Sequence, residues 1–157
     1  MANILAARID NRLVHGQVGM TWVNSIGANL ILVANDKAAN DPVQQSLMDM
    51  VVPAGIDTRY FTIEKTAAVI HKAADRQKIL LVCQTPQDVL ALTEKGLVVP
   101  EWIVGNMHFA EGKKQITPTV SVDEEDIKTF KKISEFGVKL TVKGVPTDLG
   151  KDIMKLL

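Results

Sequence analysis

The sequence predicts a three-layer α/β fold, in which a mostly parallel central sheet carries helices on both faces. Short aliphatic runs, of which residues 30–34 and 79–83 are the plainest, alternate along the chain with longer stretches of helical apolar spacing. Strands that alternate with crossover helices form parallel sheets, and strands buried on both faces have nearly continuous apolar sequences. The length of 157 residues is that of one domain, so we expect residues 1–157 to form a single domain.

The elements of the first half follow from local signals. Residues 3–9 are predicted to form the first strand, and residues 17–26 a helix that ends at Gly27, a residue suited to the turn after a helix. Asp41 and Pro42 are typical of an N-cap and a first helical position, and they predict a helix over 42–52. The other elements expected in this half are strands over 29–34, 58–63 and 78–83 and a helix over 64–75.

The second half continues the same alternation. Thr85 is expected to cap a helix over 86–95 that ends at Gly96. Asp123 is expected to begin a helix that runs to Phe136, and its acidic first turn suits the positive end of a helix dipole. The remaining expected elements are strands over 101–104, 119–122 and 138–142 and a closing helix over 148–156.

Composition and charge exclude several classes of protein. Lys plus Arg number 18 and Asp plus Glu number 18, so no excess of positive charge favours nucleic acid or an anionic membrane. No apolar run approaches the roughly 20 residues of a membrane span, and no secretion signal is visible, so a cytoplasmic protein is expected. Cys83 is the only cysteine and the three histidines are far apart, so we expect no disulfide and no metal site. A nucleotide-binding glycine motif is also absent, and no cofactor is expected.

Reactive side chains gather after the first expected strand. In an open α/β sheet, ligands bind beyond the carboxyl ends of the strands. Asp10, Arg12 and His15 lie at this position, before the next helix. A neutral imidazole can attack phosphorus and hold the phosphoryl group through a P–N bond. Arg12 can donate to phosphoryl oxygens, and Asp10 can accept from the imidazole or hold Arg12 in place. His15 is therefore a candidate phosphoryl carrier, with a helix-capping or interface histidine as the alternative.

Two further groups complete the predicted site. Free N–H groups at the start of a helix bind phosphate oxygens. The predicted phosphate-binding residues are Gly16, Gln17 and Val18, together with Arg8 at the end of the first strand. Polar residues after the other strands are candidates for supporting or docking roles, namely Asn35, Asp36, Asn106 and His108.

Residues 8–18, Arg-Ile-Asp-Asn-Arg-Leu-Val-His-Gly-Gln-Val, resemble the active-site segment of mannose-type IIB proteins. These proteins belong to the bacterial phosphoenolpyruvate-dependent sugar phosphotransferase system, in the mannose, fructose and sorbose family. The resemblance covers essentially the whole chain, with supporting segments at 33–36, 79–82 and 103–107. Segments 35–45, 73–78 and 105–108 resemble the branch for N-acetylgalactosamine or galactosamine. The family commonly has Asp or Glu where this chain has Asn11, so one charge beside the site is missing.

The resemblance implies a protein-N(pi)-phosphohistidine–sugar phosphotransferase subunit without a cofactor. His15 would accept a phosphoryl group on Nδ1 from a histidine of a IIA protein, which is charged in turn by the carrier protein HPr. It would then pass the group to a sugar held by the membrane IIC and IID proteins, at the cytoplasmic face of the membrane.

Two other functions stay open at this point. A flavodoxin-like module that binds a small molecule or nucleotide would need a deep pocket and a phosphate loop. A regulatory module without phosphoryl transfer would be favoured by a missing reactive histidine. A phosphoryl carrier instead predicts that His15 lies on a shallow, exposed surface that a partner's histidine can approach.

Overall fold

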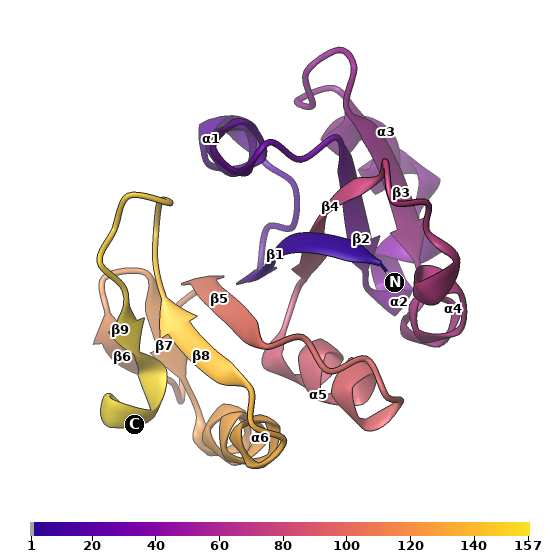
Figure 1. Ribbon diagram of the computed structural model, residues 1–157. Helices are drawn as coiled ribbons and strands as arrows, with labels where there is room; N and C mark the ends of the chain where they lie inside the picture. Colours follow the sequence, from indigo (N-terminus) through magenta and orange to yellow (C-terminus); the bar gives the residue numbers. More distant parts are fainter. Residues whose placement is uncertain (1) are drawn as a thin grey trace.

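The central sheet has seven strands, and every neighbouring pair except the last is parallel. The computed structural model describes residues 2–157, apart from the side chains of residues 17–19. In spatial order the strands are β3 (Asp57–Phe61), β2 (Leu30–Ala34), β4 (Lys78–Cys83), β1 (Asn3–Asp10), β5 (Glu101–Asn106), β8 (Lys139–Val142) and the antiparallel β9 (Lys151–Asp152) (Figure 1).

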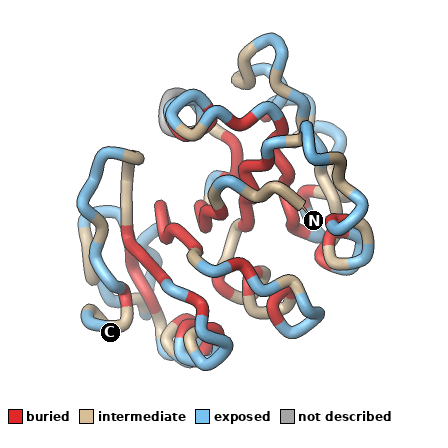
Figure 2. Tube along the Cα trace, in the orientation of Figure 1, coloured by how far each residue is buried: buried red, intermediate tan, exposed pale blue. Residues whose placement is uncertain are grey.

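Helices cover both faces of this sheet, and the predicted α/β class is confirmed (Figure 1). One face carries α1 (Gly16–Ile26), α2 (Asp36–Ala39) and α3 (Pro42–Asp49), and the other α4 (Ile63–Val69), α5 (Pro86–Glu94) and α6 (Glu124–Glu135). The buried apolar residues divide accordingly: Leu80 belongs to the same core cluster as Trp22 of α1, whereas Leu81 belongs to the cluster that contains Phe130 of α6. Figure 2 shows the buried segments concentrated along the strands. No helix among the described residues is long and apolar enough to span a bilayer.

Side-chain caps hold the helix starts where the sequence predicts them. The carboxylate of Asp41 accepts a hydrogen bond from the Gln44 N–H at 3.1 Å. Thr85 caps α5 by accepting from the N–H of Asp88 at 3.2 Å. Asp123 and Asp126 form a reciprocal capping box at the start of α6. These caps satisfy N–H groups that have no partner within their helix.

The predicted closing helix over 148–156 is wrong. Gly150 has a φ of +76°, a left-handed conformation that interrupts a right-handed helix. The next residues form β9, which pairs with the edge of β8, and only η2 (Ile153–Lys155) makes a helical turn. Asp148 closes the preceding loop by accepting from the N–H groups of Gly144 and Val145.

Other differences concern short elements. The predicted strand over 58–63 ends at Phe61 because Thr62 caps α4, and this helix ends at Val69 before the 3-10 turn η1 (Ile70–Lys72). The predicted strand over 119–122 is present as β7 (Val120–Val122), but α2 and the antiparallel partner of β7, β6 (Lys114–Thr117), were not expected. The four residues of α2 and of β6 carry too little periodicity to indicate a helix or a strand.

The sheet order places the loop after β1 at the centre of one edge. β1 lies between β4 and β5 and runs parallel to both, so the carboxyl ends of all three strands meet at that edge. Asp10 at the end of β1 pairs with Asn106 at the end of β5. The residues that follow these strands are therefore neighbours in space.

Candidate active site around His15

The loop after β1 is anchored by two buried apolar side chains. The Leu13 N–H donates to the Asp10 carbonyl at 3.0 Å. Leu13 has a φ of +57°, a conformation that residues with a side chain seldom adopt and that is common at functional sites. The side chains of Leu13 and Val14 are buried in the core cluster on the α1 face. This anchoring fixes the positions of Asp10 and His15 at the two ends of the loop.

Asp10 is a fully buried carboxylate that accepts hydrogen bonds from three residues. Its Oδ2 lies 3.1 Å from Arg8 Nη2 and 3.1 Å from His15 Nε2. Its Oδ1 accepts from the Arg12 N–H at 2.9 Å and from Arg12 Nε at 3.3 Å. Burial alone would raise the pKa of Asp10, but the bonds from His15 and Arg12 and the charge of Arg8 outweigh it and lower the pKa to about 2. Asp10 is therefore an anion at neutral pH.

The contact with Asp10 distinguishes the two ring nitrogens of His15. An ionised carboxylate only accepts hydrogen bonds, so Nε2 carries the proton in this contact. In the neutral ring, Nδ1 then has the free lone pair. His15 is the N-cap residue of α1 but makes no capping bond with its side chain, because the ring is turned to Asp10.

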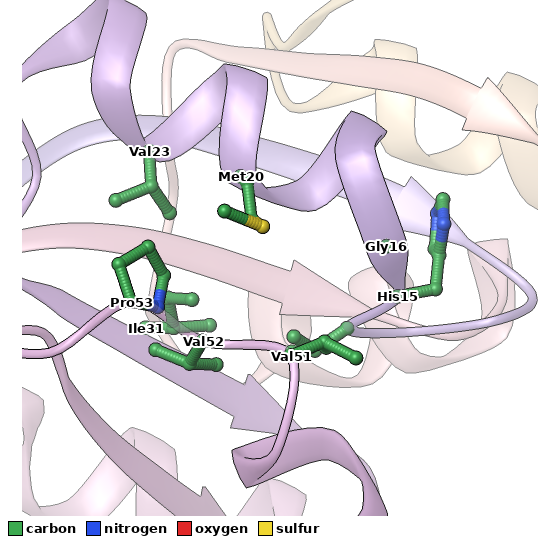
Figure 3. A pocket seen from close by; sticks show the side chains of 9 residues that line it. His15, Gly16, Met20, Val23, Ile31, Val51, Val52 and Pro53 are labelled. Atoms are coloured by element: carbon green, nitrogen blue, oxygen red, sulfur yellow. The ribbon is translucent and has the colours of Figure 1, made fainter.

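His15 borders only shallow hollows among the described residues. Figure 3 shows its ring beside the first turn of α1, at one end of a group of apolar side chains that includes Met20, Val51 and Pro53. The space between these side chains does not admit a water molecule. A second hollow, between His15 and Trp22, measures about 10 Å³. The His15 side chain is only 19% exposed, because Asp10 holds the ring against the protein, whereas the sequence predicted an exposed His15.

The two arginines of the predicted site have different surroundings. The Arg12 side chain is 40% exposed, and within the described residues its hydrogen bonds are confined to Nε. The Arg8 side chain is only 5% exposed, and both of its terminal nitrogens are engaged within the protein. Burial lowers the pKa of Arg8, while the charge of Asp10 acts in the opposite direction. This placement differs from the phosphate contact predicted for Arg8, because its donors are already paired with Asp10 and with two backbone carbonyls.

The predicted phosphate-binding residues at the start of α1 are described only in part. Gly16 is the first residue of the helix and is exposed. Gln17 and Val18 lie outside the residues that the structure describes in full, so their predicted contacts stay predictions.

Asn11 links the reactive loop to two neighbouring strand ends. Its Nδ2 donates to the Gln84 carbonyl at 3.2 Å, and Gln84 Nε2 donates back to the Asn11 carbonyl at 3.1 Å. Asn11 Oδ1 accepts from the His108 N–H, and the Asn11 N–H donates to the Asn106 carbonyl at 3.0 Å. The carboxamide uses both a donor and an acceptor, which explains how Asn is accommodated at this position.

The other supporting candidates continue this polar edge. Asn35 caps α2, and its Nδ2 donates to Gln84 Oε1 at 3.3 Å and to Asp88 Oδ2 at 2.9 Å. Asp36 accepts from the Ile63 N–H at 2.8 Å and so joins α2 to α4. Among the described residues, Asn106 has a buried Nδ2 without a partner. Gln84 was not predicted as a site residue, but it joins Asn11 to Asn35. Its position directly after β4, at the same sheet edge, could have indicated this role.

The lowered pKa of Asp10 predicts a pH-dependent stability. Because the pKa is lower in the folded protein than its ordinary value of 3.8, ionised Asp10 stabilises the fold above about pH 4. This contribution, about 2 kcal/mol from the size of the shift, is lost as the pH falls toward 2. We expect urea unfolding between pH 3 and 6 to give a free-energy difference between wild type and Asp10→Asn that shrinks as the pH falls. A difference independent of pH would contradict the assignment.

An Asp–Arg–His loop at the carboxyl edge of a parallel sheet, with only shallow hollows beside it among the described residues, suits transfer of a small group between proteins. An α/β domain with such a loop fits the class of phosphoryl-carrying subunits. A family model described as "PTS system sorbose subfamily IIB component" matches residues 4–157, and the chain belongs to this family of sugar phosphotransferase components. The predicted family is thus confirmed.

Individual relatives and solved structures are similar to this chain over 96–100% of its length. The N-acetylgalactosamine-specific phosphotransferase enzyme IIB component 2 of Escherichia coli K12 is 56% identical over 100% of both chains. The crystal structure of the E. coli N-acetylgalactosamine-specific IIB component 1 is 52% identical, with a TM-score of 0.92 over 96% of this chain and 99% of that one. An N-acetylgalactosamine IIB structure from Streptococcus pyogenes is 35% identical, with a TM-score of 0.93 over 99% and 98% of the two chains.

Proposed function

We propose that this IIB component carries the phosphoryl group on Nδ1 of His15. The supporting observation is the 3.1 Å contact between His15 Nε2 and the buried carboxylate of Asp10. Because an ionised Asp10 holds the proton on Nε2, the lone pair of Nδ1 is available to a phosphorus atom. The ring is fixed at one nitrogen and reactive at the other, which is the condition that a nucleophilic imidazole requires.

The proposed transfer exchanges one P–N bond for another. The Nδ1 lone pair attacks the phosphorus of a phosphohistidine on the donor protein, the P–N bond of the donor breaks, and its electron pair returns to the donor nitrogen. The His15 ring keeps its Nε2 proton and gains positive character, which the charge of Asp10 stabilises. In the second transfer a sugar hydroxyl attacks the phosphorus, the bond to Nδ1 breaks, and the hydroxyl proton leaves to a base of the acceptor site.

Arg12 and the start of α1 are proposed to hold the phosphoryl oxygens. Transfer of this kind depends mainly on positioning and on stabilisation of the charge of the oxygens. Arg12 is held to Asp10 through Nε, and 40% of its side chain is exposed to an incoming group. The first N–H groups of a helix have no hydrogen-bond partner within the helix. At α1 the side chain of the N-cap residue His15 does not accept from them. Gly16, Gln17 and Val18 are the proposed source of these groups.

Replacing Arg12 by Ala tests this assignment. We expect the rate of phosphoryl transfer to fall about 10²-fold, the usual loss when one preorganised donor to a developing charge is removed. The fold should be kept, because the Arg12 N–H still donates to Asp10 after the side chain is removed. Rapid-mixing transfer from a phosphorylated IIA protein measures the rate, with Arg76→Ala at an exposed position as the control. A normal rate for Arg12→Ala would exclude the phosphate role.

The proposed partners are a IIA protein as donor and membrane IIC and IID proteins as acceptors, with the protein at the cytoplasmic face of the membrane. N-acetylgalactosamine or galactosamine is the proposed sugar, supported by relatives named for N-acetylgalactosamine at 56% and 52% identity. Uptake of each sugar by cells carrying the cognate membrane proteins, with and without this protein, tests the sugar. Uptake of a different hexose alone would exclude both sugars.

The carrier function itself is tested by labelling. The protein is incubated with phosphoenolpyruvate, enzyme I, HPr and the cognate IIA protein, and mass spectrometry then locates the phosphate. The expected product is one acid-labile, base-stable phosphate on His15. Label on another residue, or none with all components active, would contradict the proposal.

A further inference from the structure

Arg8 occupies a slot between an aromatic ring and a glycine. The centre of its guanidinium lies 5.2 Å from the ring centroid of Trp22 in α1, within the range of a cation–π contact. On its other side lies Gly105 of β5. A Cβ added at Gly105 would lie 2.1 Å from Arg8 Cζ and 2.4 Å from both terminal nitrogens. The guanidinium therefore fills the space that a side chain at position 105 would take.

The same guanidinium joins the reactive loop to a distant part of the chain. Its Nη2 donates to Asp10 Oδ2 at 3.1 Å, while its Nη1 donates to the carbonyls of Lys143 at 3.2 Å and Gly144 at 3.3 Å. Trp22 Nε1 donates to the same Gly144 carbonyl at 3.1 Å. Arg8 and Trp22 thus hold one backbone segment after β8, and Arg8 also connects that segment to Asp10.

Asp10 Oδ2 is the atom on which these contacts converge. It accepts from Arg8 and from His15 Nε2 at equal distances of 3.1 Å. The charged and titratable groups that face it are Arg8 from β1 and Arg12 and His15 from the following loop. Any shift of the guanidinium would move Oδ2 or rotate the carboxylate, and the ring of His15 would lose its fixed acceptor.

We propose that Arg8 is a positioning residue for phosphoryl transfer, which fixes Asp10 Oδ2 and thereby the Nε2-protonated form and the orientation of the His15 ring. A planar guanidinium is needed for this role, because it donates in two directions at once and stacks on Trp22. A lysine ammonium can supply the charge but not the planar pair of donors. The catalytic part of this proposal rests on the proposed carrier function, whereas its effect on the His15 ring does not.

The test is Arg8→Met, which keeps an unbranched apolar stem and removes the guanidinium. The ¹⁵N chemical shifts of His15 report which ring nitrogen carries the proton, and they are measured in the neutral ring without any partner protein. We expect the wild type to be protonated at Nε2 and the variant to be a mixture of both forms. Single-turnover transfer from phosphorylated IIA should fall about 10²-fold, the size of loss that a small misplacement of a reacting group causes. The KM for the donor should not change.

Three further variants separate positioning from a loss of stability. Gly105→Ala keeps the Arg8 charge but displaces the guanidinium, and we expect the same mixture of ring forms. Arg8→Lys should restore the transfer rate only in part. Ile133→Val removes a methylene in the core of the α6 face and should lower the melting temperature without changing the ring form or the rate.

The outcomes decide between the alternatives. If Arg8→Met and Gly105→Ala keep the Nε2-protonated ring and a normal rate, Arg8 has a structural role only and the proposal is wrong. If Arg8→Met does not fold, the ring form and transfer rate of Gly105→Ala and Arg8→Lys decide whether Arg8 positions the His15 ring. If the wild type never accepts phosphate, the carrier function fails, while the ¹⁵N shifts still test the contact between Arg8, Asp10 and His15.

Discussion

Replacing His15 by Gln is expected to abolish phosphoryl acceptance and to leave the fold intact. The nitrogen of a carboxamide has no available lone pair, so it cannot form the P–N bond. The Gln side chain can still donate to Asp10, and position 15 is partly exposed, so we expect little change in melting temperature. Incubation with phosphoenolpyruvate and the phosphoryl-transfer proteins, followed by intact-mass measurement, should give no phosphorylated species.

The other two histidines provide the comparison. His71 is an exposed residue of η1, and His71→Gln should be labelled like the wild type. His108 contacts the reactive loop through its backbone N–H, which donates to Asn11 and is kept in His108→Gln. This variant should therefore still accept phosphate on His15. Phosphate found on His108 in the His15→Gln protein would move the carrier role to the neighbouring loop.

Strands and helices with strong local signals could be predicted from the sequence. The aliphatic run of β4 and the side-chain caps at Asp41, Thr85 and Asp123 depend on residues within one element, so the pattern contains the information. The final segment could not be predicted in this way. Its conformation depends on a left-handed Gly150 and on pairing with the edge of β8, and neither appears in the spacing of apolar residues.

In the candidate site, too, contacts within one loop could be predicted from the sequence, whereas contacts between distant parts of the chain could not. Asp10, Arg12 and His15 lie within six consecutive residues, and their contacts with one another follow from one short loop. The surroundings of Arg8 depend on a carbonyl 135 residues further along the chain. The position of Arg8 just before the reactive loop suggests a phosphate ligand, but the fold places the carbonyls of Lys143 and Gly144 against its guanidinium. Only the sheet order, which places β5 beside β1 and β8 beside β5, determines this result.

Asp10→Asn is expected to have the largest effect among the residues that do not form the bond to phosphorus. A carboxamide has one acceptor where Asp10 uses two, so either orientation of Asn places an N–H group against another donor. With the amide toward His15, the ring must present an unprotonated Nε2, and the proton moves to Nδ1. With the amide toward Arg12, the Arg12 N–H and Nε lose their acceptor. Transfer should fall about 10⁴-fold, as when the carboxylate that orients a catalytic histidine becomes its amide.

The same substitution should reduce stability, because it leaves the buried charge of Arg8 without its partner. Breaking one half of a buried ion pair costs about 3–5 kcal/mol, and urea unfolding at pH 7 measures this loss. Asp126→Asn is the matched control: it alters a buried carboxylate that accepts from Gln87 and Lys113 in the α6 capping box, away from His15. We expect it to lower stability and to leave transfer unchanged. Normal transfer by Asp10→Asn would mean that the His15 ring is held by something other than the carboxylate 3.1 Å from Nε2.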